Sequence, residues 1–454
     1  VYLPRRCVVH IDFLRQQFAD NGSADALVWR DQVISYDQLL AEVDNWVDIL
    51  GEEVISKGSV VSIEADFSPR AIALMLALIE HNCVVVPLSS SVQSQIPEFR
   101  EIAQVEVIMS VGDDDVPKIS RTGAAADHPV LMKLRDAEHP GLILFSSGST
   151  GKSKAAVHDF VPMLEKYKVS RHSLRTITFL LFDHIGGVNT LLYNLSNAGC
   201  VITVQDRSPD AVCEAIAKYD VELLPTSPTF LNLIIVSGAY EKHDLSSLKM
   251  VTYGTEVMPE STLARFHELF PNVRLLQTYG LSEVGILRSK SRSSDSLWVK
   301  VGGEGFDTRI VEGKLEIKAK SAMLGYLNAP SPFTEDGWFK TGDAVEVDGD
   351  YIRILGRESE LINVGGEKVY PAEVESTLQL MDGVEEVVVK GESHPLTGNI
   401  VVARVRLNTD ETLGEFRKRM RKFCSSRLAR FKIPQKVEMA DTSLHGERFK
   451  KMRK

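Results

Sequence analysis

Residues 142–154 read Leu-Ile-Leu-Phe-Ser-Ser-Gly-Ser-Thr-Gly-Lys-Ser-Lys, an apolar strand that runs directly into a polar loop. Two glycines allow the backbone of this loop to approach a ligand closely. The hydroxyl side chains offer hydrogen-bond donors, and Lys152 and Lys154 supply positive charge. The stretch therefore predicts a phosphate-binding loop at the end of a strand.

The loop has two other interpretations. The P-loop of nucleotide triphosphatases has the pattern Gly-x-x-x-x-Gly-Lys-Ser/Thr. Residues 151–153 match its end, but its first glycine would fall on Ser146, so the pattern does not fit. A flexible Gly/Ser linker is the alternative when the loop is considered alone.

Helical and strand patterns alternate through the N-terminal two thirds of the chain. An apolar stripe at helical spacing follows Ser35, and residues 70–80 predict a second helix. Apolar runs at residues 60–63 and 83–88 predict strands on either side of that helix. Strands that are apolar on both faces are typical of parallel sheets covered by helices. We therefore expect an α/β fold with a large N-terminal domain of mostly parallel sheets.

The pattern changes after about Ser289, where charged and apolar residues alternate as in antiparallel strands with one exposed face. We expect a small antiparallel subdomain there. After Arg357 the chain has enough apolar positions for a second, small core. The expected domains are residues 1–356 and an α+β domain of residues 357–454, with a helix at 372–380, strands at 384–389 and 399–407, and a basic helix at 412–430.

Composition and charge exclude several classes of protein. Of the 454 residues, 44% are hydrophobic and 25% charged, which argues against disordered and fibrous proteins. The net charge of -10 argues against general binding to nucleic acid or to an anionic membrane. No apolar run approaches the about 20 residues that span a bilayer, so the cytoplasm is the expected compartment. Five widely spaced cysteines without a Cys-x-x-Cys pair predict neither a disulfide framework nor a zinc site.

The charge is unevenly distributed along the chain. Residues 411–454 contain fourteen Lys or Arg and five Asp or Glu, so a basic end follows an acidic body. Such an end either meets phosphate groups or forms a solvated helix face.

Further motifs follow the loop in order. They are Gln-Thr-Tyr-Gly-Leu-Ser-Glu at residues 277–283, Gly-Trp-Phe-Lys-Thr-Gly-Asp at 337–343, Gly-Arg at 356–357 and Ile-Asn-Val-Gly-Gly-Glu-Lys-Val-Tyr-Pro-Ala-Glu-Val-Glu at 362–375. Together they resemble the motifs of AMP-forming, adenylate-forming enzymes, which include acyl-CoA and aryl-CoA ligases, peptide-synthetase adenylation domains and luciferase. The resemblance covers about residues 35–454.

The resemblance implies a chemistry. In this superfamily a small carboxylic acid reacts with ATP and Mg²⁺ to give an acyl adenylate and pyrophosphate, and a thiol then displaces AMP. The implied acceptor is coenzyme A or the phosphopantetheine of an acyl carrier protein. A mobile C-terminal domain that rotates between the two half-reactions is also implied.

The resemblance also implies site residues. Thr150 and Glu283 would hold the metal, Tyr279 would pack on adenine, and Asp343 would accept from the ribose hydroxyls. The residues expected to bind nucleotide or pantetheine are Ser146, Ser147, Gly148, Ser149, Thr150, Gly151, Lys154, Gly254, Thr255, Glu256, Gln277, Thr278, Tyr279, Gly280, Ser282, Asp343, Arg357, Gly365 and Gly366. The residues expected to act in catalysis are Lys450, Lys154, Thr150, Glu283 and His184.

The sequence departs from the family at the catalytic lysine, which lies in a Gly-Lys-Ile/Val-x-Arg motif near the C-terminus. Counting without gaps from residues 432–434, which resemble Lys-x-Pro, places Lys450 at that position. Alignment on Gly446 would place Glu447 there instead. A carboxylate cannot stabilise a phosphate anion, so Lys450 is preferred.

Residues 182–187 read Phe-Asp-His-Ile-Gly-Gly and resemble the Phe-His-x-x-Gly segment of acyl-CoA ligases, in which the histidine lies beside the acid. Asp183 is a departure, and Phe182-Asp183 also aligns with the Phe-Asp of amino-acid-activating domains. The leading hypothesis is an AMP-forming acyl- or aryl-CoA ligase. The alternatives are a stand-alone enzyme that loads a carrier protein and a nucleotide-binding homologue with impaired catalysis.

Overall fold

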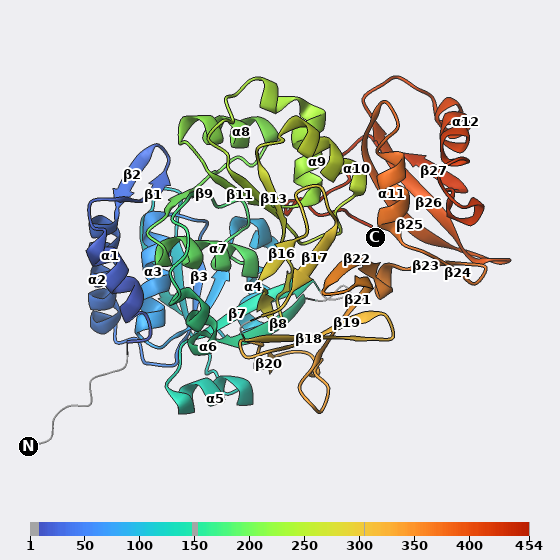
Figure 1. The fold of residues 1–454 in the computed structure, drawn as a ribbon. Coiled ribbons are helices and arrows are strands. Elements are labelled where there is room, and N and C mark those ends of the chain that lie inside the picture. The colour runs from blue at the N-terminus through green and yellow to red at the C-terminus, as the bar shows by residue number, and fades with distance from the viewer. Residues whose placement is uncertain (1–8, 148–152, 304, 454) are drawn as a thin grey trace, which may run out of the picture.

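The computed structural model describes residues 9–147, 153–303 and 305–453. Two seven-stranded sheets and their helices form most of the N-terminal part, and a six-stranded sheet follows them (Figure 1). A five-stranded sheet with two helices forms the C-terminal part. The α/β class predicted from the sequence is confirmed.

The first seven-stranded sheet contains the strand that precedes residues 148–152. Its members are β3 (Val60–Glu64), β4 (Val84–Leu88), β5 (Val107–Val111), β6 (Pro117–Arg121), β7 (Gly141–Ser147), β8 (Ser153–Asp159) and β20 (Gly325–Tyr326). The order is β20-β8-β7-β4-β3-β5-β6. Strand β3 pairs in parallel with β4 and β5, and β4 with β7, as the apolar runs predicted.

Alternate residues of this sheet belong to two cores. Val60 and Val84 pack with α4 (Ile96–Ile102) and α5 (Pro129–Ala137). Val61 and Val85 pack with α2 (Tyr36–Glu52) and α3 (Pro69–Glu80) on the other face. Ser35 caps the start of α2, where Ser35 and Gln38 form a reciprocal capping box.

The second seven-stranded sheet lies on the other side of the same helices. Its members are β1 (Asp25–Trp29), β2 (Gln32–Ser35), β9 (Arg175–Ile177), β10 (Cys200–Ile202), β11 (Leu223–Thr226), β12 (Met250–Tyr253) and β13 (Arg274–Gln277). They run in the order β13-β12-β11-β9-β10-β1-β2, and only the β1–β2 pair is antiparallel.

The strands of this second sheet also face two cores. Leu27 and Val201 join the core of α1 (Asp12–Asp20), α2, α3 and α7 (Ile185–Ser196). Val28 and Ile202 join the core of α8 (Pro209–Lys218), α9 (Pro228–Ser237) and α10 (Glu260–Leu269). Helices α2, α3 and α7 are therefore sandwiched between the two sheets, and a short helix, α6 (Phe160–Leu164), follows β8.

The predicted antiparallel subdomain is present. Its six strands are β16 (Ser289–Ser291), β17 (Trp298–Val301), β18 (Phe306–Val311), β19 (Lys314–Ala319), β21 (Phe339–Asp348) and β22 (Tyr351–Arg357), in the order β16-β17-β22-β21-β19-β18. A two-residue pair, β14 (Gly280–Leu281) and β15 (Gly285–Ile286), precedes them beside the cavity described below.

The C-terminal part begins after β22 ends at Arg357. Its sheet has the order β24-β23-β26-β25, and β27 lies beside β26. The core of this part contains Val374 of α11 and Phe416 of α12. The elements are β23 (Ile362–Val364), β24 (Glu367–Val369), α11 (Pro371–Leu378), β25 (Val384–His394), β26 (Gly398–Leu407), α12 (Leu413–Cys424) and β27 (Lys436–Met439).

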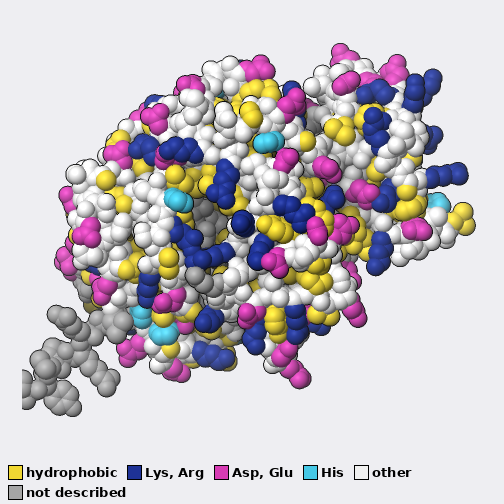
Figure 2. All heavy atoms as spheres, in the orientation of Figure 1, with side chains coloured by type: hydrophobic (Ala, Val, Ile, Leu, Met, Phe, Trp, Pro, Cys, Tyr) yellow, Lys and Arg dark blue, Asp and Glu magenta, His cyan; other side chains and the backbone are white. Residues whose placement is uncertain are grey.

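The basic helix predicted for residues 412–430 ends earlier, at Cys424. Its buried residues, Phe416, Met420 and Cys424, stop there, and Pro434 holds Ile433 in an extended conformation soon afterwards. Helix α12 lies on the outer side of the C-terminal part, where Lys and Arg side chains project into solvent (Figures 1 and 2). Most of the basic end is therefore a solvated surface, and only its last residues return to the N-terminal part.

Among the residues that the structure describes, no helix has the length and apolar character needed to cross a membrane.

Candidate active site

Carboxyl ends of strands from both seven-stranded sheets meet at a cavity of about 190 Å³. In open α/β sheets, ligands bind outside these ends of the strands. Figure 2 shows a hollow on this face with Lys and Arg side chains at its border. The expected site residues that line the cavity are Ser146, His184, Gly254, Thr255, Thr278, Gly280, Ser282, Glu283, Arg357 and Lys450.

The end of the chain reaches the cavity as a tight hairpin turn. His445 pairs with Lys451 across the turn. Phe449 near the tip has a φ of 50°, and its ring packs against Phe179 and Phe230 of the N-terminal part. A left-handed backbone is uncommon for a bulky residue, so these contacts hold the tip in a conformation that the backbone alone disfavours.

Hydrogen bonds on both sides of Lys450 fix it in place. Ser227 Oγ donates to the carbonyl of Phe449 at 2.8 Å, and the amide of Lys451 donates to Glu256 Oε1 at 2.6 Å. Burial lowers the pKa of Lys450 to about 8, although the charge of Glu256 acts in the opposite direction.

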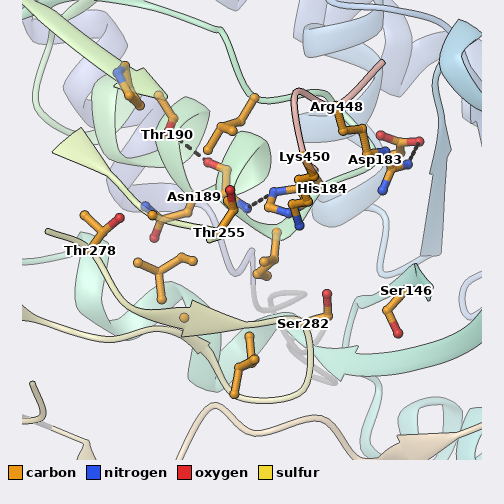
Figure 3. Close-up of a pocket in the computed structure, with 18 of the residues that line it drawn as sticks. Ser146, Asp183, His184, Asn189, Thr190, Thr255, Thr278, Ser282, Arg448 and Lys450 are labelled. Atoms are coloured by element: carbon orange, nitrogen blue, oxygen red, sulfur yellow. Dashed lines mark hydrogen bonds and ion pairs between the residues drawn. The ribbon is translucent and has the colours of Figure 1, made fainter. Parts of the chain in front are cut away.

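The two possible registers of the C-terminal motif place different residues at the cavity. Lys450 lines it, beside His184 in Figure 3. Glu447, which the alternative register would use, is exposed at the turn and is not among the lining residues.

His184 caps the N-terminus of α7. Its Nδ1 accepts a hydrogen bond from the amide of Gly186 at 3.0 Å (Figure 3). Burial, and then the positive charges of Lys450 and Arg448, lower the pKa of His184 well below its ordinary value. The imidazole is therefore neutral near pH 7, and because Nδ1 accepts, its proton is on Nε2.

An ion pair joins the turn to the loop before α7. Arg448 Nη2 lies 2.8 Å from Asp183 Oδ2, and the Asp183 side chain is 5% exposed. Burial raises the pKa of Asp183, and the charge of Arg448 opposes this rise. Sequence reasoning noted Asp183 as a departure but missed Arg448, because only folding brings these distant residues together.

Glu283 and Lys154 meet at one tyrosine. Tyr326 donates its hydroxyl to Glu283 Oε1 at 2.6 Å, and Lys154 Nζ lies 5.3 Å from the centre of the Tyr326 ring. Glu283 therefore has one oxygen held and one left to bind a ligand. Sequence reasoning did not single out Tyr326, which no motif marked.

Three residues of the nucleotide motifs contact one another beside the cavity. Asp343 Oδ2 accepts from the hydroxyl of Tyr279, and Asp343 Oδ1 lies 3.3 Å from Arg357 Nε. Burial raises the pKa of Asp343, although Arg357 lowers it. Arg357 also lines the cavity, whereas Tyr279 and Asp343 lie behind that lining.

Among the described residues, three further expected positions are not part of the cavity lining. Gln277 is buried at the end of β13. Gly365 and Gly366 form the exposed turn between β23 and β24, at the outer edge of the C-terminal part (Figure 1). The side chain of Ser147 and the residues Gly148, Ser149, Thr150 and Gly151 lie outside the described part of the chain.

A second group of polar residues lies at the cavity, and two of them, Asn189 and Thr190, were missed from sequence. Asn189 and Thr190 come from α7, and Thr226 comes from the end of β11. Asn189 Oδ1 accepts from Lys166 Nζ at 2.6 Å and from the hydroxyl of Tyr167 at 3.0 Å. Single polar residues at helical positions give no sequence signal until the fold places them together.

Two family models match the chain. The model of AMP-binding enzymes matches residues 14–315, which is more than half of the chain. The model of the AMP-binding enzyme C-terminal domain matches residues 373–448.

Curated relatives span nearly the whole chain. An indoleacetate–CoA ligase of Aromatoleum aromaticum is 26% identical, covering 92% of this chain and 91% of the relative. A 2-succinylbenzoate–CoA ligase of Enterococcus faecalis is 24% identical, covering 94% and 93%.

Solved structures share the fold. An anthranilate CoA ligase in complex with anthranoyl-AMP superimposes with a TM-score of 0.80 at 18% identity, covering 98% of this chain and 96% of that one. ATP-bound MatB from Rhodopseudomonas palustris gives a TM-score of 0.77 at 21% identity, with 96% of each chain covered.

Proposed function

The chain belongs to the family of AMP-binding enzymes, and from this premise we propose that Lys450 stabilises the α-phosphate of ATP while a short carboxylic acid attacks it. The overall activity is that of an AMP-forming acid–thiol ligase of the acyl- and aryl-CoA ligase type. ATP and coenzyme A are its co-substrates. The observation that carries the proposal is the position of Lys450 in the cavity, fixed by bonds on both sides.

The first half-reaction joins the acid to AMP. A carboxylate oxygen forms a bond to the α-phosphorus, and the bond from that phosphorus to the bridging oxygen of the β-phosphate breaks. The electron pair leaves with pyrophosphate. Negative charge on the phosphate oxygens has to be stabilised as the bonds rearrange, and fixed cations in a water-poor site do this most effectively.

Lys450 meets this requirement. Its ammonium is held in the cavity by the turn, and burial makes its charge costly to keep without an anion nearby. Binding of phosphate oxygens would supply that anion and raise the pKa again. Lys154 on β8 is the second cation expected at the phosphates.

His184 is proposed to orient the acid. Its Nδ1 is engaged by Gly186, so Nε2–H is free to donate to a carboxylate oxygen. A neutral imidazole holds the carboxylate without protonating it, which keeps the attacking oxygen nucleophilic.

The residues at the cavity also suit Mg²⁺. Glu283 offers one free carboxylate oxygen, while Tyr326 fixes the other. Clusters of three or more His, Cys, Asp or Glu side chains suited to a metal are absent from the described residues, so Mg²⁺ would take most of its ligands from phosphates and water, as is usual for this ion. When bound, the ion would neutralise charge on the phosphates, and Glu283 would hold it, with Thr150 as the second expected ligand.

In the second half-reaction the sulfur of the thiol attacks the acyl carbon, the bond to the AMP oxygen breaks, and the thiol proton passes to solvent. Gly365 and Gly366 are proposed to line the thiol route after the C-terminal domain rotates. In the arrangement described, Lys450 lines the cavity and these glycines are not among its lining residues. This arrangement suits adenylation.

A panel of carboxylic acids tests the proposal through pyrophosphate release in the presence of Mg²⁺ and ATP. We expect release that depends on the acid and is lost in Lys450→Ala. Supplying coenzyme A or a phosphopantetheinylated carrier protein then identifies the acceptor. ATP binding without pyrophosphate release from any acid would overturn the proposal in favour of a homologue with impaired catalysis.

A further inference from the structure

One end of the cavity carries a hydrogen-bonding group of its own. Asn189 and Thr190 of α7 lie at the side remote from Ser146 and Asp183 in Figure 3. Four lining residues of α7 (Ile185, Gly186, Asn189 and Thr190) are spaced so that they share one face of the helix. The acid substrate would lie along this face of α7, with its reacting carboxylate at His184.

The Asn189 amide has a defined orientation. Its Oδ1 accepts from Lys166 Nζ at 2.6 Å and from the Tyr167 hydroxyl at 3.0 Å. Lysine is only a donor, so the amide oxygen has to face it, and the amide NH₂ points the other way. Since Asn189 lines the cavity, this NH₂ is a donor available to a ligand there.

A second polar group at the same cavity lacks a partner. Thr226, at the end of β11, is 2% exposed, and its Oγ1 makes no hydrogen bond within the described part of the chain. A buried hydroxyl without a partner is unfavourable in the folded protein, so such a group at a cavity indicates a ligand that satisfies it.

The lysine behind Asn189 is also unusual. Lys166 is half-buried, its Nζ lies 3.4 Å from the carbonyl of Ile286, and no Asp or Glu within the described residues is seen to form an ion pair with it. Burial without a carboxylate partner lowers the pKa of Lys166 to about 8. Its positive potential acts through Asn189 on whatever binds at the amide NH₂.

Around these polar groups the lining is apolar, with Leu180, Leu281 and Ile286 among its residues. The volume of about 190 Å³ is below the about 300–1,000 Å³ typical of pockets for drug-sized ligands. The cavity therefore has little room for the acid. A long hydrocarbon chain would also leave the Asn189 amide and the Thr226 hydroxyl without a hydrogen-bond acceptor.

We infer that the acid substrate carries a second oxygen acceptor, remote from its reacting carboxylate, which the Asn189 amide and the Thr226 hydroxyl bind. The acceptor class includes a hydroxyl, a ketone and a second carboxylate. This inference rests on the proposed function and specifies its substrate class. A site built to bind such a group discriminates against an analogue that lacks it, because the buried donors are then left unpaired.

Matched acids of equal chain length test the inference. Pyrophosphate release is measured with hexanoate, 6-hydroxyhexanoate, 5-oxohexanoate and adipate, and with benzoate beside its 3- and 4-hydroxy and 3- and 4-carboxy forms. We expect kcat/KM to be about ten- to a hundredfold higher for the best oxygenated member than for the parent acid.

Two substitutions of similar size locate the effect. Asn189→Leu and Thr226→Val should each reduce the preference for the oxygenated acid towards the parent acid. Thr203→Val is the matched control, because Thr203 is not among the lining residues, its hydroxyl donates to the carbonyl of Val28 at 3.0 Å, and its loss should leave the ratio unchanged.

Lys166→Met identifies the kind of acceptor. The variant should fold, because replacing an unpaired, half-buried cation by an apolar side chain removes a desolvation cost. A selective loss of the dicarboxylate over the hydroxy acid identifies a carboxylate acceptor, and an equal effect on both identifies a neutral oxygen.

The possible failures are distinguishable. Parent acids that react as well as every oxygenated partner, with ratios unaltered in Asn189→Leu and Thr226→Val, would overturn the inference while leaving the ligase activity intact. Absence of pyrophosphate release from all of these acids and from the wider panel would instead overturn the proposed function.

Discussion

Arg448 of the C-terminal turn forms a 2.8 Å ion pair with Asp183, a nearly buried carboxylate immediately before His184. The pair gives Asp183 a partner within the protein. The resemblance of Phe182-Asp183 to amino-acid-activating domains would instead imply an aspartate that pairs with the α-amino group of the substrate. The ion pair with Arg448 therefore favours the acyl- or aryl-CoA ligase interpretation, and it ties the position of the C-terminal domain to the loop beside the acid.

Asp183→Asn should weaken the attachment of the C-terminal turn to the loop before α7, because it removes the charge that pairs with Arg448. With the turn inserted, Arg448 would remain largely buried without a counter-charge, whereas rotation of the domain would expose it to water. We expect adenylation to slow by about ten- to a hundredfold, corresponding to about 1–3 kcal/mol lost from the inserted arrangement. Thioester formation from a supplied acyl adenylate should be unaffected or faster.

A double variant distinguishes loss of the Arg448–Asp183 ion pair from a general loss of enzyme activity. Asp183→Asn combined with Arg448→Gln removes both charges and should recover part of the adenylation rate. Equal losses in both half-reactions for Asp183→Asn, with no recovery in the double variant, would contradict a role in domain position.

Lys450→Ala should depress adenylation by about 100- to 1,000-fold, the usual effect of removing one fixed group that stabilises a developing anion. Thioester formation from the acyl adenylate should persist. Lys418→Ala is the control, since Lys418 is an exposed lysine of α12 and is not among the residues that line the cavity. Full adenylation activity in Lys450→Ala would show that another residue supplies the cation.

The pKa of about 8 for Lys450 predicts a decline of adenylation at alkaline pH. The ammonium is the active form and is lost as pH rises through this value, so kcat/KM for ATP should fall about tenfold per pH unit above it. His184 stays neutral across the range, because burial holds its pKa well below its ordinary value. Lys450→Arg keeps a charge at all these pH values, and an unchanged alkaline decline in that variant would assign the titration to another group.

The sequence predicted those features that depend on local composition or on a contiguous motif. The apolar runs around Val60 and Val84 led to the parallel sheet, because each strand has to be apolar on both faces to be buried between helices. The motif around Glu283, which lines the cavity, was recognisable for the same reason. The motif comparison gave two possible positions for the catalytic lysine. Counting from residues 432–434 favoured Lys450 over Glu447 but did not exclude Glu447.

Features that depend on contacts between distant segments were not predictable from one sequence. Arg448 and Asp183 are 265 residues apart, and no sequence pattern links the two positions. Asn189 acquires its orientation only because α7 lies beside Lys166 and Tyr167. The end of α12 was placed too late because the basic pattern continued after the buried face had stopped at Cys424.

Glu375→Gln should destabilise the C-terminal end of the chain. Glu375 is 1% exposed and accepts charged hydrogen bonds from Lys451 and Arg453. Removing the acid from a buried ion cluster leaves uncompensated cations, which costs about 3–5 kcal/mol. Thermal unfolding and proteolysis of the tail would measure the loss. Glu373→Gln, which breaks an exposed pair with Lys432, is the control and should cost about 1 kcal/mol or less.

The same cluster predicts how stability depends on acid. Burial by itself would raise the pKa of Glu375, but the charges of Lys451 and Arg453 outweigh burial and lower it overall. A lowered pKa in the folded state means that the stabilisation is complete above the unfolded value of about 4.3 and is lost as pH falls through the folded value. Glu375→Gln should therefore show less acid destabilisation than the parent protein, and an identical acid profile would argue against the cluster.

Tyr326→Phe should weaken the use of Mg²⁺ without removing a metal ligand. The hydroxyl of Tyr326 holds Glu283 Oε1 at 2.6 Å, and its loss leaves the carboxylate free to rotate away from the phosphates. Loss of a partner that orients a metal ligand typically costs about 10- to 100-fold in metal affinity. Calorimetric titration of ATP at varied Mg²⁺ would measure this independently of turnover. Tyr351→Phe on β22 is the matched control, because its ring lies over Arg292 and away from the cavity lining. Equal Mg²⁺ dependence in the two variants would show that Glu283 does not need Tyr326 to reach the ion.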